Sequence, residues 1–194
     1  MMPISDQREL RARMTPLIPP GLTEHIDRVV TLAAALAERH AFDGVTTERL
    51  LLAAQGHDLL RALEPAELLA RAVNSGLEVD PVERAAPVLL HGPLAAEELC
   101  AEFGLCDLWV LHAVRWHTSG HPDFDDAAWA FFIADKVEPW KVEQWPALQS
   151  VLDAAWDSPV QAALRYLELN IERGESRGWQ QHPMALSARR ALSD

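Results

Sequence analysis

Apolar residues recur at the three- and four-residue spacing of a helix along most of this chain. The clearest case is the segment 21–40, where one face of the predicted helix carries Ile26, Val29, Val30, Ala33, Ala34 and Ala37. Ala, Leu, Glu and Arg are abundant, and no run alternates strictly enough between apolar and polar residues to predict a strand. The sequence therefore predicts an all-α fold.

Capping and turn residues divide the chain into further helices. The first opens at Gly21 or Thr23 and ends near His40, and the second is capped by Thr46 or Thr47. We predict the later helices over residues 49–63, 64–73, 91–103, 107–117, 125–137 and 158–173, with a short turn at 80–81. No Gly- or Ser-rich linker divides the 194 residues, a length that suits one domain. We expect a partly helical N-terminal segment (1–20), one helical domain (21–175) and a polar, partly mobile tail (176–194).

The charge of the chain limits its partners. Lys and Arg number 17 and Asp and Glu 29, which gives a formal net charge of −12. Such a surface repels a nucleic acid backbone, so we expect no nucleic acid partner. It also repels a phosphorylated substrate, which can bind only where metals or a few basic side chains override the overall charge. No window approaches ~20 uninterrupted apolar residues and no signal peptide is apparent, so we expect a cytoplasmic protein without a membrane span.

The two cysteines, Cys100 and Cys106, fit neither a redox pair nor a zinc knuckle by their spacing. We expect both to be small apolar core residues, which is consistent with a reducing compartment.

Histidines and aspartates occur in apolar contexts where such residues are costly unless they are paired or bind a cation. Asp58 follows His57 inside an apolar stretch predicted to be helical, and Asp135 follows Phe131-Phe132-Ile133-Ala134. The other candidates are His25, His91 and His117. Singly, each has a structural explanation: Asp135 can pair with Lys136, and Asp58 with Arg61. Together, four His and two Asp are typical of a metal site assembled from several helices, and suit iron, manganese, zinc or cobalt.

The order and local sequence of these segments resemble the motifs of a known family, the HD superfamily of phosphohydrolases. The closer resemblance is to its symmetrical bis(5'-nucleosyl)-tetraphosphate hydrolases of the YqeK type. It rests on five segments within residues 25–139: His25-Ile26-Asp27-Arg28-Val29, His57-Asp58, Leu90-His91-Gly92, His117-Thr118-Ser119-Gly120 and Ala134-Asp135-Lys136-Val137-Glu138-Pro139. The last two are the specific ones.

This resemblance implies an HD-domain helical bundle with two divalent transition metals, for which iron is our first candidate and manganese, cobalt and zinc are alternatives. One metal would be held by His25, His57, Asp58 and Asp135, and the second by His91 and His117, with Asp58 as the bridge. The implied reaction is the symmetrical hydrolysis of diadenosine tetraphosphate to two ADP. Two metals in such a site bind phosphoryl oxygens and lower the pKa of a shared water.

Three positions depart from the family pattern. Arg61 stands where the family usually has Lys; it can bind phosphate through a bidentate guanidinium, or simply pair with Asp58. His121 stands where a basic residue is usual, and Trp140-Lys141 replaces Gly-Arg. We take Asp58 and Arg61 as the catalytic candidates. Arg28, Arg61, His121 and Lys141 are the substrate-binding candidates, although a surface salt bridge explains Arg28 equally well.

The expected function is therefore cleavage of a dinucleoside tetraphosphate, a small-molecule substrate. One alternative is an HD phosphohydrolase acting on another nucleotide, such as a nucleoside mono- or diphosphate or a guanosine alarmone. A second is a nucleotide-binding regulator that keeps the metals and has lost turnover. A homodimer is left open.

Overall fold

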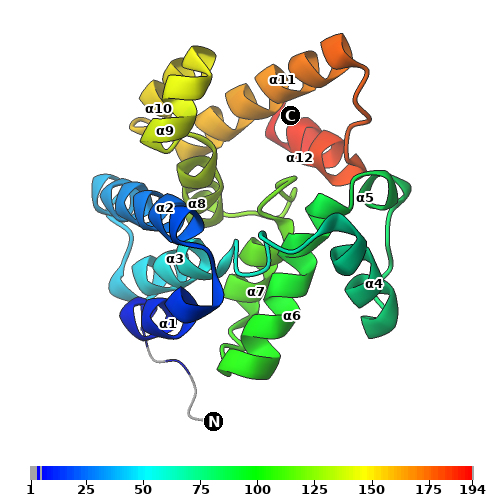
Figure 1. The fold of residues 1–194 in the computed structure, drawn as a ribbon. Helices are drawn as coiled ribbons and strands as arrows, with labels where there is room; N and C mark the ends of the chain where they lie inside the picture. Colours follow the sequence, from blue (N-terminus) through cyan, green and yellow to red (C-terminus); the bar gives the residue numbers. More distant parts are fainter. Residues whose placement is uncertain (1–3, 5, 194) are drawn as a thin grey trace.

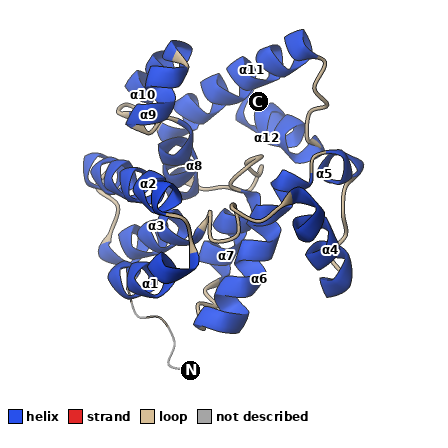
Figure 2. Cartoon of the chain, in the orientation of Figure 1, coloured by secondary structure: helices blue, strands red, loops and turns tan. Residues whose placement is uncertain are grey.

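The computed structural model describes residue 4 and residues 6–193, and within them all regular secondary structure is helical, joined by loops and turns, with no strand (Figure 2). Twelve α-helices and three short 3-10 helices occur in this part of the chain: α1 (Gln7–Met14), η1 (Thr15–Leu17), α2 (Pro20–Arg39), α3 (Gly44–Gly56), α4 (Pro65–Ser75), α5 (Pro81–Ala85), η2 (Pro87–Leu90), α6 (His91–Phe103), α7 (Leu108–Trp116), α8 (Asp126–Lys136), α9 (Pro139–Gln144), η3 (Pro146–Leu148), α10 (Gln149–Ala155), α11 (Pro159–Arg177) and α12 (Pro183–Ser193). The predicted all-α, single-domain fold is confirmed.

Helix α8 lies at the centre of the fold. It packs against α2, α3 and α11, while α6 and α7 pack against each other beside α3 (Figure 1). From Ala127 to Asp135 every residue of α8 is buried, which is why this segment reads as apolar without an exposed face. Its aromatic side chains, Trp129, Phe131 and Phe132, are among the largest fully buried groups in the described chain. The core therefore surrounds the helix that carries Asp135.

Several helix ends follow from the local sequence. Asp43, rather than Thr46 or Thr47, caps α3 and accepts a hydrogen bond from the Thr46 backbone N–H at 2.7 Å. Asp107 caps α7 as predicted. Gly76 and Gly104 end α4 and α6 in the left-handed conformation, which glycine adopts at little cost.

Two expectations about helix extent are corrected. Helix α3 ends at Gly56, so His57 and Asp58 lie at and just beyond its C-terminus rather than in the middle of a longer helix. Helix α11 continues past Gly174 to Arg177, and the expected polar tail contains helix α12, which packs against α11. Ala185 and Ala188 of α12 are buried, because small side chains on one face of this polar helix contact the body of the protein. The proposed boundaries at residues 21 and 175 stay predictions.

The expectation for the cysteines is wrong. Cys106 is exposed and Cys100 only partly buried, and the two form a disulfide that connects the end of α6 to the turn before α7. The sequence spacing alone does not suggest this pair. The two cysteines come close only because the chain turns at Gly104, directly after α6. The expected reducing compartment thereby loses its support.

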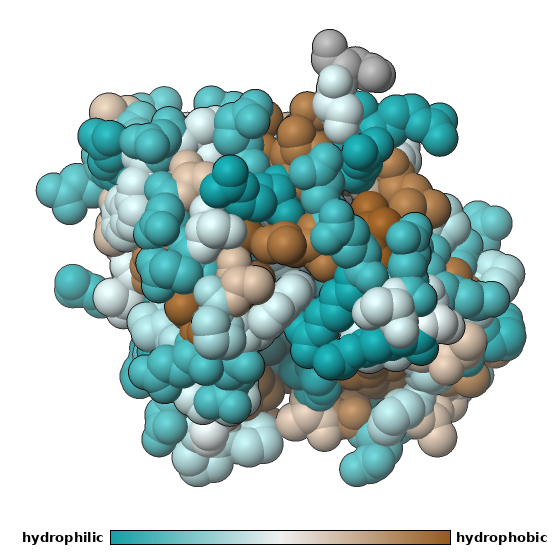
Figure 3. Space-filling view, turned by 90° about the horizontal axis from the view of Figure 1, so that it is seen from above, coloured by the Kyte–Doolittle hydropathy of each residue, from teal (hydrophilic) through white to brown (hydrophobic). Residues whose placement is uncertain are grey.

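On the face seen in Figure 3, polar and charged residues cover most of the area and apolar residues show only in patches between them. No helix in the described part of the chain is both long and apolar enough to cross a membrane.

Candidate metal centre

All six predicted metal ligands lie together at the ends and on the inner faces of five helices. His25 comes from α2, His57 and Asp58 from the end of α3, and His91 from the first turn of α6. His117 follows α7, and Asp135 lies in the last turn of α8. Five of the six are buried, and His25 is partly buried.

The first group of ligand atoms surrounds one carboxylate oxygen of Asp58. His25 Nε2 lies 3.6 Å from Asp58 Oδ2 and 3.3 Å from Asp135 Oδ1. His57 Nε2 lies 3.6 Å from each of the same two oxygens. Two ligands that each bind one ion at about 2.0–2.2 Å lie roughly 3 Å apart. The spacing of these four atoms therefore fits a single metal ion.

The second group surrounds the other carboxylate oxygen of Asp58. His91 Nε2 lies 3.0 Å from Asp58 Oδ1, and His117 Nε2 lies 3.6 Å from it. The two imidazole nitrogens are 3.0 Å apart. Asp58 thus presents one oxygen to each group, which is the arrangement of a carboxylate that bridges two metals.

Three of the histidines are held by backbone carbonyls. Nδ1–H of His57 donates to the carbonyl of Ala54 at 2.8 Å, and Nδ1–H of His117 donates to Val114 at 2.7 Å. His91 makes the equivalent bond to Val88. Since a carbonyl can only accept, each Nδ1 carries a proton, and in the neutral imidazole Nε2 therefore carries a lone pair directed into the cluster.

The donor set fits metal ions. His57 Nε2 is buried and has no hydrogen-bond partner among the described residues. A buried, unpartnered acceptor is costly unless a cation binds it. Burial also lowers the pKa of His117 to about 3, so its imidazole is neutral and able to act as a ligand. Imidazole nitrogens with carboxylate oxygens are ligands that iron, manganese, zinc and cobalt accept.

His25 is held by a carboxylate instead, that of Glu138. His25 Nδ1 lies 3.3 Å from Glu138 Oε1, and the Arg28 Nε–H donates to Glu138 Oε2 at 2.6 Å. Glu138 is fully buried, and burial alone would raise its pKa; the bonds from His25 and Arg28 instead lower that pKa to about 2. Glu138 therefore stays ionised and fixes the His25 ring. The matching motif in the sequence includes Glu138 but assigns it no role, and its position directly before Pro139 is the signal that the sequence offers.

The two ligand carboxylates are also held in the ionised form. Burial would raise the pKa of both, but positive charge on His57 and His91 and hydrogen bonds from His117 and His91, available when these rings are protonated, lower the pKa of Asp58 well below its usual range. For Asp135 the ammonium groups of Lys136 and Lys141 do the same. Lys136 Nζ lies 2.6 Å from Asp135 Oδ2, so the predicted alternative partner of Asp135 does contact it, in addition to the histidines.

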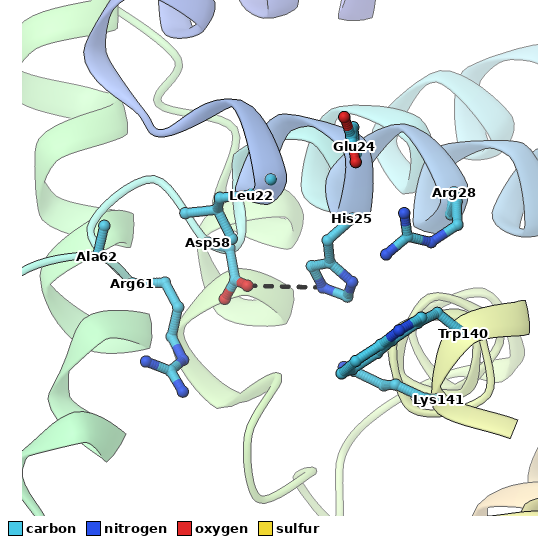
Figure 4. A pocket seen from close by; sticks show the side chains of 10 residues that line it. Leu22, Glu24, His25, Arg28, Asp58, Arg61, Ala62, Trp140 and Lys141 are labelled. Atoms are coloured by element: carbon cyan, nitrogen blue, oxygen red, sulfur yellow. Dashed lines mark ion pairs between the residues drawn. The ribbon is translucent and has the colours of Figure 1, made fainter. Parts of the chain in front are cut away.

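A cleft of about 580 Å³ opens beside this cluster (Figure 4). It is bounded by α2, the turn after α3, and α9, and its lining residues are Gly21, Leu22, Glu24, His25, Arg28, Asp58, Arg61, Ala62, Trp140 and Lys141. Trp140 is 54% exposed, so its aromatic ring forms part of the open wall of the cleft. The cleft reaches the predicted metal ligands directly, because His25 and Asp58 form part of its wall.

Three of the four predicted substrate-binding residues line this cleft, and the fourth does not. Arg61 lines the cleft near Asp58 but forms no side-chain ion pair or hydrogen bond with any described residue, Asp58 included, so its guanidinium is available (Figure 4). Arg28 lines the cleft while bound to Glu138, and Lys141 lines it while its Nζ contacts Asp135 Oδ1 at 2.7 Å. His121 is not in the lining.

His121 lies instead among aromatic side chains. Its ring centroid is 4.5 Å from that of His112, and it also contacts Trp116 and Phe124. Burial lowers the pKa of His121, so it is less readily charged than an exposed histidine. These contacts give no support to the predicted phosphate contact of His121.

The sequence is similar to known proteins over most of its length. The sequence matches the HD domain family over residues 22–140. It is 30% identical over 145 residues to a symmetrical bis(5'-nucleosyl)-tetraphosphatase of Halalkalibacterium halodurans, covering 73% of this chain and 74% of that protein. A protein of the same name from Staphylococcus aureus is 29% identical over 140 residues, 72% of this chain and 69% of that one.

A solved structure shares the fold. It is a predicted HD superfamily hydrolase involved in NAD metabolism from Clostridium acetobutylicum, with a TM-score of 0.87, 22% identity and 98% of each chain covered. The family match spans all the segments from His25 to Asp135 that supply the buried cluster. The chain therefore belongs to the HD domain family of phosphohydrolases.

Proposed function

We propose that this protein hydrolyses a dinucleoside tetraphosphate symmetrically, taking diadenosine tetraphosphate to two ADP. The observation that carries the proposal is the Asp58 carboxylate, with one oxygen in each of two histidine groups, on the wall of a cleft that also presents a free arginine. The names of the curated relatives, symmetrical bis(5'-nucleosyl)-tetraphosphatases, support the choice of substrate.

The six clustered side chains would hold two divalent transition metals, with iron as the first candidate. His25, His57 and Asp135 would hold one ion, His91 and His117 the other, and Asp58 both. When bound, such a pair supplies Lewis-acid stabilisation of phosphoryl oxygens and an activated water.

The side chains around the pair would bind and orient the phosphate chain. Arg61 is free to form two parallel hydrogen bonds to phosphate oxygens, and it adds positive charge where negative charge develops during the reaction. Arg28 and Lys141 already have carboxylate partners, and each can turn a remaining N–H toward a phosphate in the cleft. With a net charge of −12 on the chain, these local cations decide whether a polyanion can enter.

The test is a product profile. The purified, metal-loaded protein is incubated with diadenosine tetraphosphate, and the nucleotides are separated over time. Only ADP should accumulate, in twice the amount of substrate consumed. AMP together with ATP would contradict symmetrical cleavage.

A nucleotide panel measured in parallel distinguishes the alternatives. Faster turnover of a nucleoside mono- or diphosphate, or of a guanosine alarmone, would identify a different substrate for the same site. Nucleotide binding without turnover by protein that retains its metals would identify a regulator instead of an enzyme.

A further inference from the structure

A second cavity, of about 300 Å³, lies beyond Trp140 and Lys141, between α8, α9 and α11. Its lining residues are Lys136, Trp140, Lys141, Gln144, Trp145, Leu148, Tyr166, Asn170 and Arg173. Trp140 and Lys141 also line the cleft at the metal centre, so the two cavities share a wall.

The charge of this cavity is unusual for so acidic a chain. Three cationic side chains line it, and none of the described residues in its lining is acidic. Lys136 and Lys141 share a single carboxylate, that of Asp135, at 2.6 and 2.7 Å, so the pair keeps an excess of positive charge. The cavity therefore has a positive potential in a protein whose net charge is −12.

Arg173 contributes a further unneutralised charge. Its guanidinium lies 4.2 Å from the Trp145 ring centroid, and it forms no ion pair or hydrogen bond with the described residues. The positions one turn away on α11 are Leu169, Asn170, Ser176 and Arg177, none of them acidic. Stacking on Trp145 holds the guanidinium in place and leaves its N–H donors available.

Neutral hydrogen-bonding groups complete the lining. The Tyr166 hydroxyl and the side-chain amides of Gln144 and Asn170 have no hydrogen-bond partner among the described residues. Burial raises the pKa of Tyr166 to about 12, so its hydroxyl stays protonated and can donate. Cations and free donors around one small cavity are what a phosphate group requires.

We propose that this cavity is a second phosphate subsite, which binds the outer phosphates of one half of the substrate while the central phosphates lie at the metal centre. The subsite rests on the proposed function, since a chain of four phosphates needs cations on more than one side of the bond that breaks. Its position suits this role, because Lys141 contacts the metal ligand Asp135 and also lines the cavity. Arg173 is the specificity-determining residue of the subsite.

The test measures binding separately from turnover. The probe is a diadenosine tetraphosphate analogue with a methylene group between its two central phosphorus atoms, which cannot be cleaved there. Its Kd is measured by calorimetry for the metal-loaded wild type and for Arg173→Met, which keeps an aliphatic stem over Trp145 and removes the charge. The matched control is Arg177→Met, on the same helix, where the guanidinium lies over the exposed Trp179 outside the cavity.

Arg173→Met should raise the Kd of the analogue about tenfold or more, and Arg177→Met less than about twofold. Arg173→Lys, which restores the charge, should recover part of the affinity. Hydrolysis of bis(p-nitrophenyl) phosphate, which needs only the metal centre, should be unchanged in all three variants.

An unchanged Kd in Arg173→Met would overturn the subsite, as would an equal loss in the Arg177→Met control. A parallel loss of metal or of bis(p-nitrophenyl) phosphate hydrolysis would also overturn it, because Arg173 would then act through the fold. If the wild type binds the analogue but does not release two ADP from the natural tetraphosphate, the proposed function fails and the Kd comparison still decides the subsite. Absence of analogue binding in the wild type contradicts both.

Discussion

The imidazoles of His57, His91 and His117 each donate Nδ1–H to a carbonyl three residues earlier in the chain. Each histidine lies at a helix end, where such carbonyls are not all used by the helix itself. The backbone therefore sets both the tautomer and the direction of Nε2 before any metal binds, and the cost of ordering the ligands is met during folding.

Removing the Arg61 guanidinium should weaken transition-state binding and leave the metals in place. Losing a hydrogen bond to a charged group costs roughly 1.5–3 kcal/mol, so kcat/KM of Arg61→Ala should fall by roughly tenfold to a hundredfold. Arg71→Ala is the control, since Arg71 is exposed on α4 and pairs with Glu67. Steady-state kinetics with metal analysis check this, and unchanged kinetics would leave Arg61 without a role at the phosphate.

Glu138 should make stability depend on acid pH. Its pKa is about 2 in the folded protein, against 4.5 for an ordinary glutamate, so it favours folding above about pH 4.5. That contribution, on the order of 3 kcal/mol, is lost as the pH falls from about 4.5 to 2. Urea unfolding of metal-stripped Glu138→Gln should show lower stability at pH 7 and a shallower acid dependence than wild type. An equally steep acid dependence in the variant would mean that Glu138 is not the group that titrates.

The clustering of the six candidate ligands could be predicted because most are chemically costly residues in apolar segments, with neighbours typical of the family. The side chains that hold those candidate ligands in place were harder to predict from the sequence. Glu138 contacts His25, which is distant in sequence. Lys141 contacts Asp135, and this contact depends on the turn of the chain at Pro139. His121 stands beside a motif, yet the packing of Phe124 and Trp116 places it among aromatic rings.

At the scale of helices, glycines determine how closely the ligand-bearing segments approach. A Cβ on Gly56 would lie 2.7 Å from Leu99 Cδ1, and one on Gly92 would lie 2.9 Å from the Arg115 carbonyl oxygen and 3.2 Å from His117 Nδ1. The first conflict is with a flexible side-chain end, which can move. The second is with the backbone of α7 and with His117, a predicted metal ligand, and neither can move without disturbing the site.

Gly92→Ala should therefore push α6 and α7 apart and disturb the second metal position. We expect a loss of about 1–3 kcal/mol in unfolding free energy and a selective fall in metal content, because His91 and His117 lie on either side of the contact. Gly44→Ala, where nothing lies within 4 Å of the added Cβ, should be neutral or stabilising by up to about 1 kcal/mol. Denaturant unfolding and elemental analysis test this, and full metal content in Gly92→Ala would be evidence against the close-approach argument.

Helix positions were predicted well where a capping residue or a glycine marks them, as at Asp107 and Gly104. They were predicted poorly where tertiary contacts decide. The chain leaves the helix after Gly56 and places Asp58 between two histidine groups, although the apolar sequence continues through Leu60. Helix α12 is polar enough to resemble a tail, and its buried face consists of alanines that give a weak hydrophobic signal.

For the whole molecule, overall charge and local charge have opposite signs. The chain carries −12, yet both cavities at the proposed substrate site are bordered by lysine and arginine. Under the proposed function, this difference lets a polyanionic substrate bind at one place on a chain whose net charge is negative.

Metals bound to the folded chain should also stabilise it. An ion present at 100 times its Kd contributes about 2.7 kcal/mol, and 1 kcal/mol shifts the Tm of a domain of this size by about 2–4 °C. Stripping the metals with a chelator should thus lower the Tm by about 5–10 °C, and adding metal back should restore it. Calorimetry checks this; a Tm indifferent to chelation would show that the cluster holds no ion tightly.

The most direct test of the dinuclear centre is the metal content of Asp58→Ala. Elemental analysis of the purified wild type should give about two transition metals per chain, since His25 and His57 face one oxygen of Asp58 and His91 and His117 face the other. Because one carboxylate faces both groups, Asp58→Ala should retain less than one metal per chain and lose hydrolysis, with its helical circular dichroism unchanged. A variant that still binds two metals per chain would contradict the bridging role of Asp58 and, with it, this account of the site.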